Sequence, residues 1–539
     1  MESYKRTILL LNLLLCCWTS YGQTGRYVVF FSDKTDTPYS IEAPETFLSQ
    51  RAIDRRVRQN IPITAEDLPV NPAYLDSIKV LGAEVYFTTK WLNGVLVQTE
   101  ESLVTTLEAL EFVSAVEFVA PGAALTPIRE SDPGLVPEER FDPGNLSNTV
   151  QREMIGGDAM AAAGLSGAGI QIALLDGGFR NVNSSSYFRD MLEAGQYLGG
   201  KDYVTAGDNP FQYSTHGTGA LSTIVGDAGP DFKGMAPDAA ILLLVTEDVS
   251  SEYRIEEYNW LFGAEYADSL GIDILSTSLG YVDFDDPTMD YTPADLDGAT
   301  AVITRAGELA FQKGMLVVTS AGNSGGSAWR LVTTPADGPN ILAVGAVDAE
   351  RAYASFSSVG PTADGRIKPD VVAMGRSTAL FRSDFTNSSG TSFSAPQIAG
   401  LAAGLWQANP EWTNRELFDA IRERGSRSKS PNNELGYGIP HFEAERVLYI
   451  PEPAAPRRWK VYPNPLTEDH LLVEIINPQE VRSIVFYDES GKQIPASGEE
   501  ISEHKLSFDL TPLRSGVYFI TLHTLQGSET LRILKSGDQ

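Results

Sequence analysis

The chain has 539 residues, 42% of them hydrophobic and 21% charged, which is typical of a soluble globular protein with about two to four domains. Its formal net charge of −30 argues against nucleic acid as a partner, because binding a phosphate backbone requires clustered Lys and Arg. Mutual repulsion between such molecules also favours a monomer.

The amino terminus carries an export pattern. Lys5 and Arg6 precede an apolar run over 8–18, and small and polar residues follow up to Gly22. The run is too short to cross a bilayer, and its charged start and small-residue end are typical of a signal peptide. We therefore assign residues 1–22 to a cleaved signal peptide.

Both cysteines of the chain, Cys16 and Cys17, lie inside this apolar run. A mature protein that begins after the signal peptide therefore has no disulfide. A lipid anchor on Cys16 is the alternative, but Leu15 stands where lipoprotein signals carry a small residue.

Residues 23–122 have the pattern of a small α+β domain. Predicted strands cover 27–31, 84–89, 94–99 and 115–119, and predicted helices cover 45–57, a stretch after 74 that ends near 82, and 101–110. Residues 123–144 are rich in Pro, Glu, Asp and Gly without apolar periodicity, which predicts a linker or processing region.

Residues 145–450 alternate short apolar runs with helical stretches. The runs are 170–175, 241–245, 272–275, 315–318 and 341–344, and the helical stretches include 256–270 and 300–313. This pattern predicts an α/β fold with a mostly parallel sheet covered by helices on both faces. Functional side chains are then expected at the carboxyl ends of the strands.

The end of the chain forms a third region. Residues 451–458 (PEPAAPRR) predict a linker, and residues 459–539 alternate apolar and polar residues between turn signals, which indicates a small β-sandwich. A carbohydrate-binding sandwich is one alternative, but Trp459 is the only tryptophan there, so no aromatic platform is evident.

Three residues of the large domain stand in unusual local settings. Asp176 ends a predicted strand before two glycines, and His216 precedes a small-residue helix. Ser392 lies before Pro396 at the start of a predicted buried helix, where free N–H groups can stabilise negative charge. Taken alone, the Asp and the Ser each have a structural explanation, namely a turn-forming Asp and an N-cap Ser.

Taken together and in this order, the segments around these residues resemble the signatures of the subtilisin family. They read Asp-Gly-Gly from 176, His-Gly-Thr-Gly from 216 and Gly-Thr-Ser-Phe-Ser-Ala-Pro from 390, and Ser320-Ala-Gly-Asn-Ser324 matches a fourth family segment. Gly178, Gly219 and the turn at 373–375 depart from the usual pattern.

The resemblance implies a role for each matching residue. Ser392 would be the nucleophile, His216 the general base and Asp176 the group that orients the imidazole. Asn323 and the backbone N–H of Ser392 would form the oxyanion hole. The segment Ser278, Leu279 and Gly280 would bind substrate in extended form.

The flanking modules also resemble known domains. Residues 23–122 are similar to the inhibitory propeptides of this family, with a general binding domain as the alternative. Residues 459–539 resemble the C-terminal sorting domain of proteins exported by type IX secretion. These resemblances imply a secreted or cell-surface protein whose partners are protein or peptide substrates, its own propeptide and the secretion machinery.

No cofactor is required by this chemistry, and no metal ligand is assigned. Structural calcium is an open alternative at Asp283, Asp285, Asp286 and Asp290, although a solvated acidic insertion explains these residues as well.

The leading hypothesis is a secreted serine endopeptidase that is made as a zymogen. A catalytically silent surface binding protein on the same scaffold is the first alternative, and the presence of all three triad residues with Asn323 disfavours it. An esterase is disfavoured because Ser392 lacks a Gly-x-Ser-x-Gly elbow. Cleavage specificity and the processing sites cannot be read from the residues.

Overall fold

The computed structural model describes residues 24–122, 147–443 apart from 230, and most of 459–535. The protein divides into two compact units, Met1–Tyr449 and Ile450–Gln539. The predicted signal peptide, the processing region 123–144 and the linker 451–458 lie outside the described residues.

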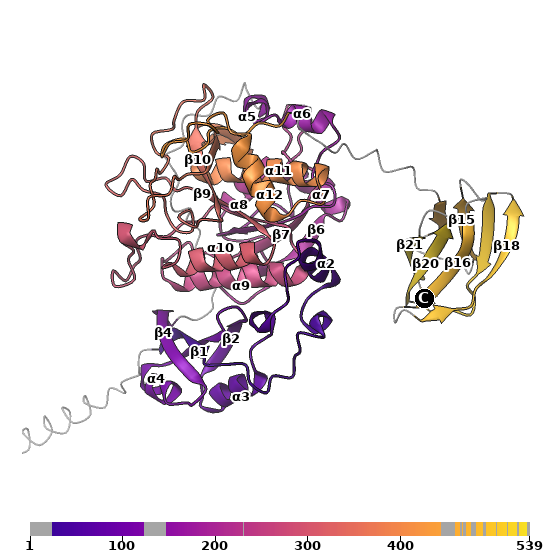
Figure 1. The fold of residues 1–539 in the computed structure, drawn as a ribbon, viewed down its shortest axis with the longest axis horizontal. Helices are drawn as coiled ribbons and strands as arrows, with labels where there is room; N and C mark the ends of the chain where they lie inside the picture. Colours follow the sequence, from indigo (N-terminus) through magenta and orange to yellow (C-terminus); the bar gives the residue numbers. More distant parts are fainter. Residues whose placement is uncertain are drawn as a thin grey trace, which may run out of the picture. The chain divides into compact units, whose positions relative to one another are not determined.

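A four-stranded antiparallel sheet with the strand order β2-β3-β1-β4 forms the N-terminal module (Figure 1). Its strands and helices are β1 (Thr24–Phe31), α2 (Gln50–Arg58), α3 (Pro72–Val80), β2 (Glu84–Thr89), β3 (Gly94–Glu100), α4 (Glu101–Glu108) and β4 (Val113–Pro121). The helix predicted over 45–57 is shorter, because Ser49 caps α2 by accepting a hydrogen bond from the Ala52 N–H at 3.2 Å.

The large domain is built on a seven-stranded parallel sheet with the order β11-β10-β9-β8-β5-β7-β6. The strands are β5 (Gln171–Asp176), β6 (Tyr197–Asp202), β7 (Ala240–Val245), β8 (Ile274–Thr277), β9 (Leu316–Ser320), β10 (Leu342–Val347) and β11 (Val371–Met374). This architecture confirms the predicted fold class. β5 lies between β7 and β8, so Asp176 is placed at the middle of the sheet edge.

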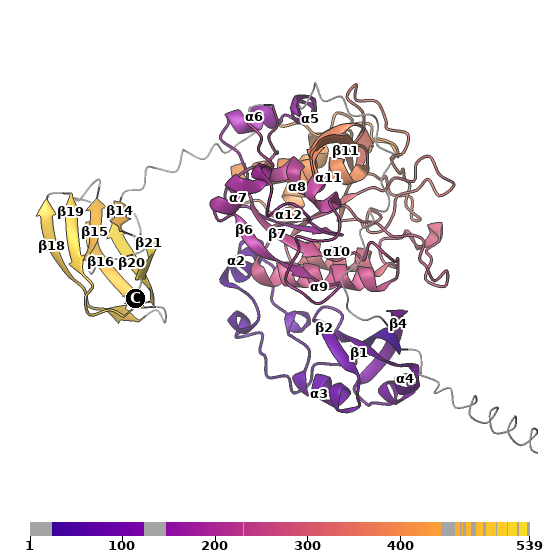
Figure 2. The same cartoon turned by 180° about the vertical axis from the view of Figure 1, so that it is seen from behind.

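Two pairs of helices cover the two faces of this sheet. Helices α8 (His216–Val225) and α11 (Thr391–Ala408) pack on one face, and α9 (Ile255–Leu270) and α10 (Val302–Gln312) pack on the other. Figures 1 and 2 show α9 and α10 between the sheet and the N-terminal module. Alternate strand residues enter different cores: Leu174 packs toward α8 and α11, and Leu175 toward α9 and α10.

Several elements of the large domain have weak sequence signals and were not predicted. Strand β6 contains two glycines and a lysine, and its outer position in the sheet leaves several of its residues partly exposed. The hairpin of β12 (Thr378–Phe381) and β13 (Phe385–Ser388) and the short helix α12 (Asn414–Glu423) were also absent from the prediction. The residues of β6 and of the hairpin depend on tertiary contacts, whereas α12 has a local signal that was missed, because Thr413 and Glu416 form a capping box and Leu417, Phe418 and Ile421 are buried together.

The second unit has two four-stranded sheets, β14-β15-β19-β18 and β17-β16-β20-β21. Its strands are β14 (Trp459–Tyr462), β15 (His470–Ile475), β16 (Val481–Asp488), β17 (Gln493–Ile494), β18 (Ser497–Ser502), β19 (Lys505–Asp509), β20 (Gly516–Thr524) and β21 (Ser528–Lys535). Trp459 is 1% exposed in the shared core, so it offers no aromatic surface to a sugar. Within the described residues, no helix is both long and apolar enough to cross a membrane.

The sheet of the N-terminal module buries a second face against α9. Val28, Trp91 and Leu96 belong to the same core as the α9 side chains, and the Phe87 ring lies 5.6 Å from the ring of Phe262. The run Tyr27 to Phe31 is apolar on both faces because one face packs on α3 and α4 and the other on the large domain.

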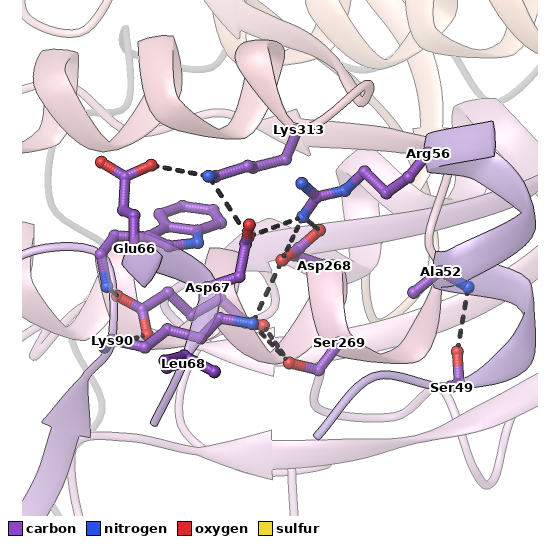
Figure 3. Close-up of polar contacts among 12 residues, drawn as sticks. Ser49, Ala52, Arg56, Glu66, Asp67, Leu68, Lys90, Asp268, Ser269 and Lys313 are labelled. Carbon is purple, nitrogen blue, oxygen red and sulfur yellow. Dashed lines mark hydrogen bonds and ion pairs between the residues drawn. The ribbon is translucent and has the colours of Figure 1, made fainter. Parts of the chain in front are cut away.

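A buried charge cluster joins the two domains at the end of α9 (Figure 3). The carboxylate of Asp268 lies 2.5 Å from Arg55, 2.8 Å from Arg56 and 3.1 Å from Lys90, and Asp268 and both arginines are at most 1% exposed. Burial acts to raise the pKa of Asp268, but Lys90, Arg56 and Arg55 hold it well below its usual range. Three cations of the N-terminal module thus share one anion of the large domain, and Arg56 also pairs with Asp67 of its own module at 3.2 Å.

Two further contacts extend this interface. Lys313, at the end of α10, forms ion pairs with Glu66 at 2.6 Å and Asp67 at 3.2 Å. The carboxylate of Glu265 accepts hydrogen bonds from the backbone N–H groups of Lys90 at 2.8 Å and Trp91 at 3.1 Å. The turn after β2 is therefore capped by a side chain of the other domain.

We predict that Asp268→Asn destabilises the full chain by about 3–5 kcal/mol, because it leaves buried cations without their counter-charge. Denaturant unfolding of the inactive Ser392→Ala chain measures the change. Since the folded pKa of Asp268 is lowered, its stabilising charge is present above about pH 3.8 and is lost as pH falls through the folded value.

The matched control is Asp76→Asn, which removes an exposed ion pair with Lys79 and should change stability by less than about 0.5 kcal/mol. Equal unfolding free energies for Asp268→Asn and the parent would show that the cluster contributes nothing.

Candidate active site

Asp176 ends strand β5 and is 2% exposed. Its Oδ1 accepts a hydrogen bond from the Gly177 N–H at 2.8 Å. Gly178 has a φ of +143°, and a Cβ there would lie 2.3 Å from the carbonyl oxygen of Gln212. Glycine at position 178, which departs from the usual family pattern, is therefore required because a second backbone segment approaches it closely.

His216 is the first residue of α8, and its ring faces Asp176. Nδ1 lies 2.9 Å from Oδ1 and 3.0 Å from Oδ2 of that carboxylate. A Cβ at Gly217 would lie 2.9 Å from the Cβ of Asp176, so only glycine lets the helix begin this close to the strand. The contact fixes the imidazole with Nδ1–H toward the carboxylate and Nε2 away from it.

The electrostatics of this pair follow from its burial. Burial acts to lower the pKa of His216, but the charge and hydrogen bond of Asp176, together with the charge of Glu247, raise it above its ordinary value. Arg382 acts weakly in the opposite direction. The imidazolium form is therefore stabilised in the folded protein.

Ser392 is the second residue of α11 and is 6% exposed. Its backbone carbonyl accepts a hydrogen bond from the Ser278 hydroxyl at 2.8 Å, and its Oγ lies 3.4 Å from the Ser278 carbonyl oxygen. The ring of the next residue, Phe393, lies 5.5 Å from the His216 ring. The packing of α8 on α11 thus brings the serine and histidine segments together.

In the described part of the chain, the Ser392 hydroxyl has no hydrogen bond to His216, since its partner is the Ser278 carbonyl. Proton transfer to Nε2 needs a distance of about 2.6–3.2 Å, so the serine side chain must turn from this position before it reacts.

Asn323 lies opposite the start of α11 with a defined amide orientation. Its Oδ1 accepts hydrogen bonds from the backbone N–H of Thr391 at 2.9 Å and from the Thr391 hydroxyl at 3.0 Å. Both donors occupy the oxygen, so the Nδ2 group faces away from Thr391 and is available as a donor. Thr391 also accepts from the Gly322 N–H at 3.2 Å, which fixes the loop that carries Asn323.

Thr391 is the positioning residue that the sequence analysis missed. Its signal was present, because the threonine belongs to the Gly-Thr-Ser segment, but only the structure gives its hydrogen-bond partners.

The segment Ser278 to Gly280 continues β8 past its carboxyl end. Leu279 is buried, Gly280 is exposed, and Tyr281 pairs with Thr334 through backbone hydrogen bonds of 3.0 and 3.3 Å. A Cβ at Gly280 would lie 2.1 Å from the Thr333 hydroxyl oxygen. The segment therefore runs beside residues 333–334 and next to Ser392.

The four loop aspartates do not gather into a metal site. Asp286 accepts hydrogen bonds from the Thr288 N–H and hydroxyl, Asp290 from the Phe284 N–H, and Asp285 from the Glu252 N–H. These bonds hold turns of the loop. Among the described residues, the one set of three acidic side chains close enough together to hold a metal ion is Glu247, Glu252 and Glu256.

The fold and this site together define an α/β protein that carries an Asp, His and Ser set, in that chain order, at the carboxyl edge of a parallel sheet. Comparison with family models agrees: residues 167–438 match the subtilase family (Peptidase S8). The chain belongs to the subtilase family, which confirms the resemblance seen in its motifs.

The flanking modules also match family models. Residues 26–132 match the peptidase S8 propeptide domain of Bacteroidota, and residues 460–536 match the secretion system C-terminal sorting domain. The second match confirms the predicted export by type IX secretion to the cell surface or beyond.

Similar curated proteins are bacterial proteases. Subtilisin NAT of Bacillus subtilis subsp. natto is 31% identical over 269 residues, which are 49% of this chain and 62% of that protein. Subtilisin of Bacillus pumilus is 30% identical over 49% of this chain and 86% of its own length. Serine protease AprX of Bacillus subtilis (strain 168) is 28% identical over 53% of this chain and 67% of its own length. The chain thus spans somewhat under two thirds of the first of these relatives.

We predict that His216 titrates above pH 6.5 in the Ser392→Ala chain and that Asp176→Asn lowers this pKa, because the charge that stabilises the imidazolium is lost. NMR titration of the imidazole ring protons gives both values. A raised folded pKa also means that His216 adds stability below about pH 6.5, and that this stability is lost as pH rises through the folded value.

Asp208→Asn is the control, because Asp208 is an exposed partner of Lys201 and should leave the His216 titration unchanged. A His216 pKa that does not respond to Asp176→Asn would contradict the assigned pairing.

Proposed function

We propose that the chain is a secreted serine endopeptidase that cleaves peptide bonds in proteins through Ser392, His216 and Asp176. The observation that carries this proposal is the paired contact of His216 Nδ1 with both oxygens of buried Asp176, beside a serine at the start of a buried helix. The similarity to proteases named as subtilisins supports the same reaction class.

The first half of the reaction forms an acyl-enzyme. Oγ of Ser392 attacks the scissile carbonyl carbon while Nε2 of His216 takes the hydroxyl proton. Asp176 stabilises the imidazolium that forms, and Nε2 then returns the proton to the leaving amine. The raised pKa of His216 is consistent with a base that holds this proton between the two transfers.

Negative charge develops on the carbonyl oxygen during this attack. Nδ2 of Asn323 and the backbone N–H of Ser392, at the amino end of the 18-residue helix α11, are the donors that would receive it. Thr391 holds the Asn323 amide in the required orientation before substrate arrives, so little reorganisation is needed. Water then attacks the acyl-enzyme by the reverse sequence of proton transfers.

The N-terminal module acts in this proposal as an intramolecular inhibitor. Its contacts with α9 and α10 combine an apolar face with a buried charge cluster, which suits a domain that folds together with its target. Removal of the module would convert a zymogen into active enzyme. The segment Ser278 to Gly280 would bind the substrate backbone, and the C-terminal sandwich would engage the secretion machinery.

A catalytically silent binding protein is the second candidate. Its weakness is physical: a retired site has no use for the Thr391 contacts that orient Asn323, nor for a buried His–Asp pair.

We predict that Ser392→Ala abolishes casein hydrolysis and fluorophosphonate labelling together, because both need the same nucleophile. The loss known for a subtilisin's serine is about 10⁶-fold, and we expect a loss of that order. The control is Ser394→Ala, since Ser394 lies in the same helix but donates its hydroxyl only to the Thr391 carbonyl, at 2.9 Å. A folded, propeptide-free parent that takes no label would favour the silent protein.

We predict that Asn323→Leu lowers kcat by about 10²–10³-fold with little change in KM, the loss known for a subtilisin's oxyanion-hole asparagine. Thr391→Ser, which keeps the hydroxyl that holds Asn323, is expected to retain most activity. Steady-state kinetics on a peptide anilide separate the two constants. A kcat within threefold of the parent in Asn323→Leu would remove Asn323 from the oxyanion hole.

A further inference from the structure

Three carboxylates outside the proposed triad converge between β7 and α9. Glu247 follows the end of β7, Glu252 lies in the connecting loop, and Glu256 is the second residue of α9. One oxygen of each lies within 4.8 Å of the others, and no other such group exists among the described residues. Glu256 is fully buried, while Glu247 and Glu252 are partly exposed, so the group is open to solvent on one side.

Two buried polar atoms at this place have no hydrogen-bond partner among the described residues. They are Oε2 of Glu256 and the hydroxyl of Tyr281, whose residues are 0% and 1% exposed. Besides burial, the charges of Glu256, Glu247 and Glu252 raise the pKa of Tyr281 well above its usual range, which locates its hydroxyl in the field of the same carboxylates. Buried polar atoms normally have partners, so these two call for a ligand.

Other buried acids of α9 show how different this group is. Glu257 accepts a hydrogen bond from the Tyr291 hydroxyl at 2.7 Å, Glu265 accepts from two backbone N–H groups, and Asp268 is surrounded by three cations. By contrast, no Lys or Arg of the described residues forms an ion pair with Glu252 or Glu256, and Glu256 accepts one long hydrogen bond, from the Tyr253 N–H at 3.4 Å.

We propose that Glu247, Glu252 and Glu256 bind a divalent cation, with Ca²⁺ as the ion that fits best. Three carboxylates without a histidine or cysteine form a hard oxygen site, which excludes a preference for zinc. Ca²⁺ takes oxygens at about 2.3–2.6 Å, so two ligands can stand up to about 5 Å apart. Mg²⁺, at about 2.1 Å, tolerates at most about 4.2 Å and demands stricter geometry.

The ion would connect three segments near the proposed active site. Glu247 and Glu256 close the loop between β7 and α9, and the Glu252 N–H donates at 3.1 Å to Asp285 in the acidic loop. A Cβ on Gly177, the neighbour of Asp176, would lie 2.7 Å from Oε2 of Glu247. The cation therefore stabilises a wall that contacts the end of β5, and the site does not depend on the proposed peptidase activity.

The test uses the full Ser392→Ala chain, treated with EDTA and then titrated with CaCl₂ in a calorimeter. The parent should bind one more equivalent of Ca²⁺ than Glu252→Gln, or bind it at least tenfold more tightly. Glu247→Gln, on a separate segment, should behave alike and replaces Glu252→Gln if that variant does not fold. Asp286→Asn is the matched control from the acidic loop and should bind as the parent does.

A second readout reports the place of the ion. Tb³⁺ bound at this site should luminesce on excitation of tyrosine, and Tyr281→Phe should reduce that signal while Ca²⁺ affinity stays within about threefold. Identical calcium stoichiometry and affinity in the parent and both glutamate variants would overturn the proposal. The proposal would also be overturned if Glu252→Gln left calcium binding unchanged but reduced the preference of the active chain for peptides with lysine over peptides with glutamine. The carboxylates would then form a substrate subsite.

Discussion

Burying both faces of the parallel sheet is the constraint on which the rest of this structure depends. A parallel sheet carries apolar side chains on both sides, so two separate pairs of helices must cover it. The pair α8 and α11 presents His216 and Ser392 at its helix starts, next to the end of β5. The pair α9 and α10 presents its outer surface to the N-terminal module. The proposed catalytic residues and the domain proposed to inhibit them thus lie on opposite sides of one sheet.

Helix α9 combines several ways of keeping an acid buried. Asp268 is paired with cations, Glu265 with backbone donors, and Glu257 with a tyrosine hydroxyl. These partners have different consequences. The ion pairs of Asp268 hold two domains together, whereas the backbone donors that Glu265 accepts from fix the conformation of a turn. Glu256 differs from these neighbours, because among the described residues it has no cation or tyrosine partner and accepts a single long hydrogen bond, from the Tyr253 N–H at 3.4 Å.

The sequence alone predicts the sheet well, and it singles out the segments that the structure brings together at the proposed site, for physical reasons. Strands buried on both faces read as continuous apolar runs, and motifs fixed by close approach, such as Gly217 beside Asp176, leave glycines at set positions. The break before α2, the polar strand β6 and the hairpin of β12 and β13 have no such local signal. The role of Thr391 and the convergence of Glu247 with Glu256 depend on distances between segments, which no spacing in the chain reveals.

The charge cluster at Asp268 also bears on what release of the N-terminal module leaves behind. Departure of Arg55, Arg56 and Lys90 would transfer the uncompensated acids of α9 from a dry interface to water, where hydration replaces the lost partners. The freed surface would then be anionic as well as apolar. The detached module is itself acidic, with 14 Asp and Glu against 8 Lys and Arg in residues 23–122, so it is repelled at long range, and only the short-range contacts of its three cations favour rebinding. Salt screens this repulsion beyond a Debye length of about 8 Å at physiological ionic strength, so saltier surroundings would ease the approach of the detached module even as they weaken its ion pairs.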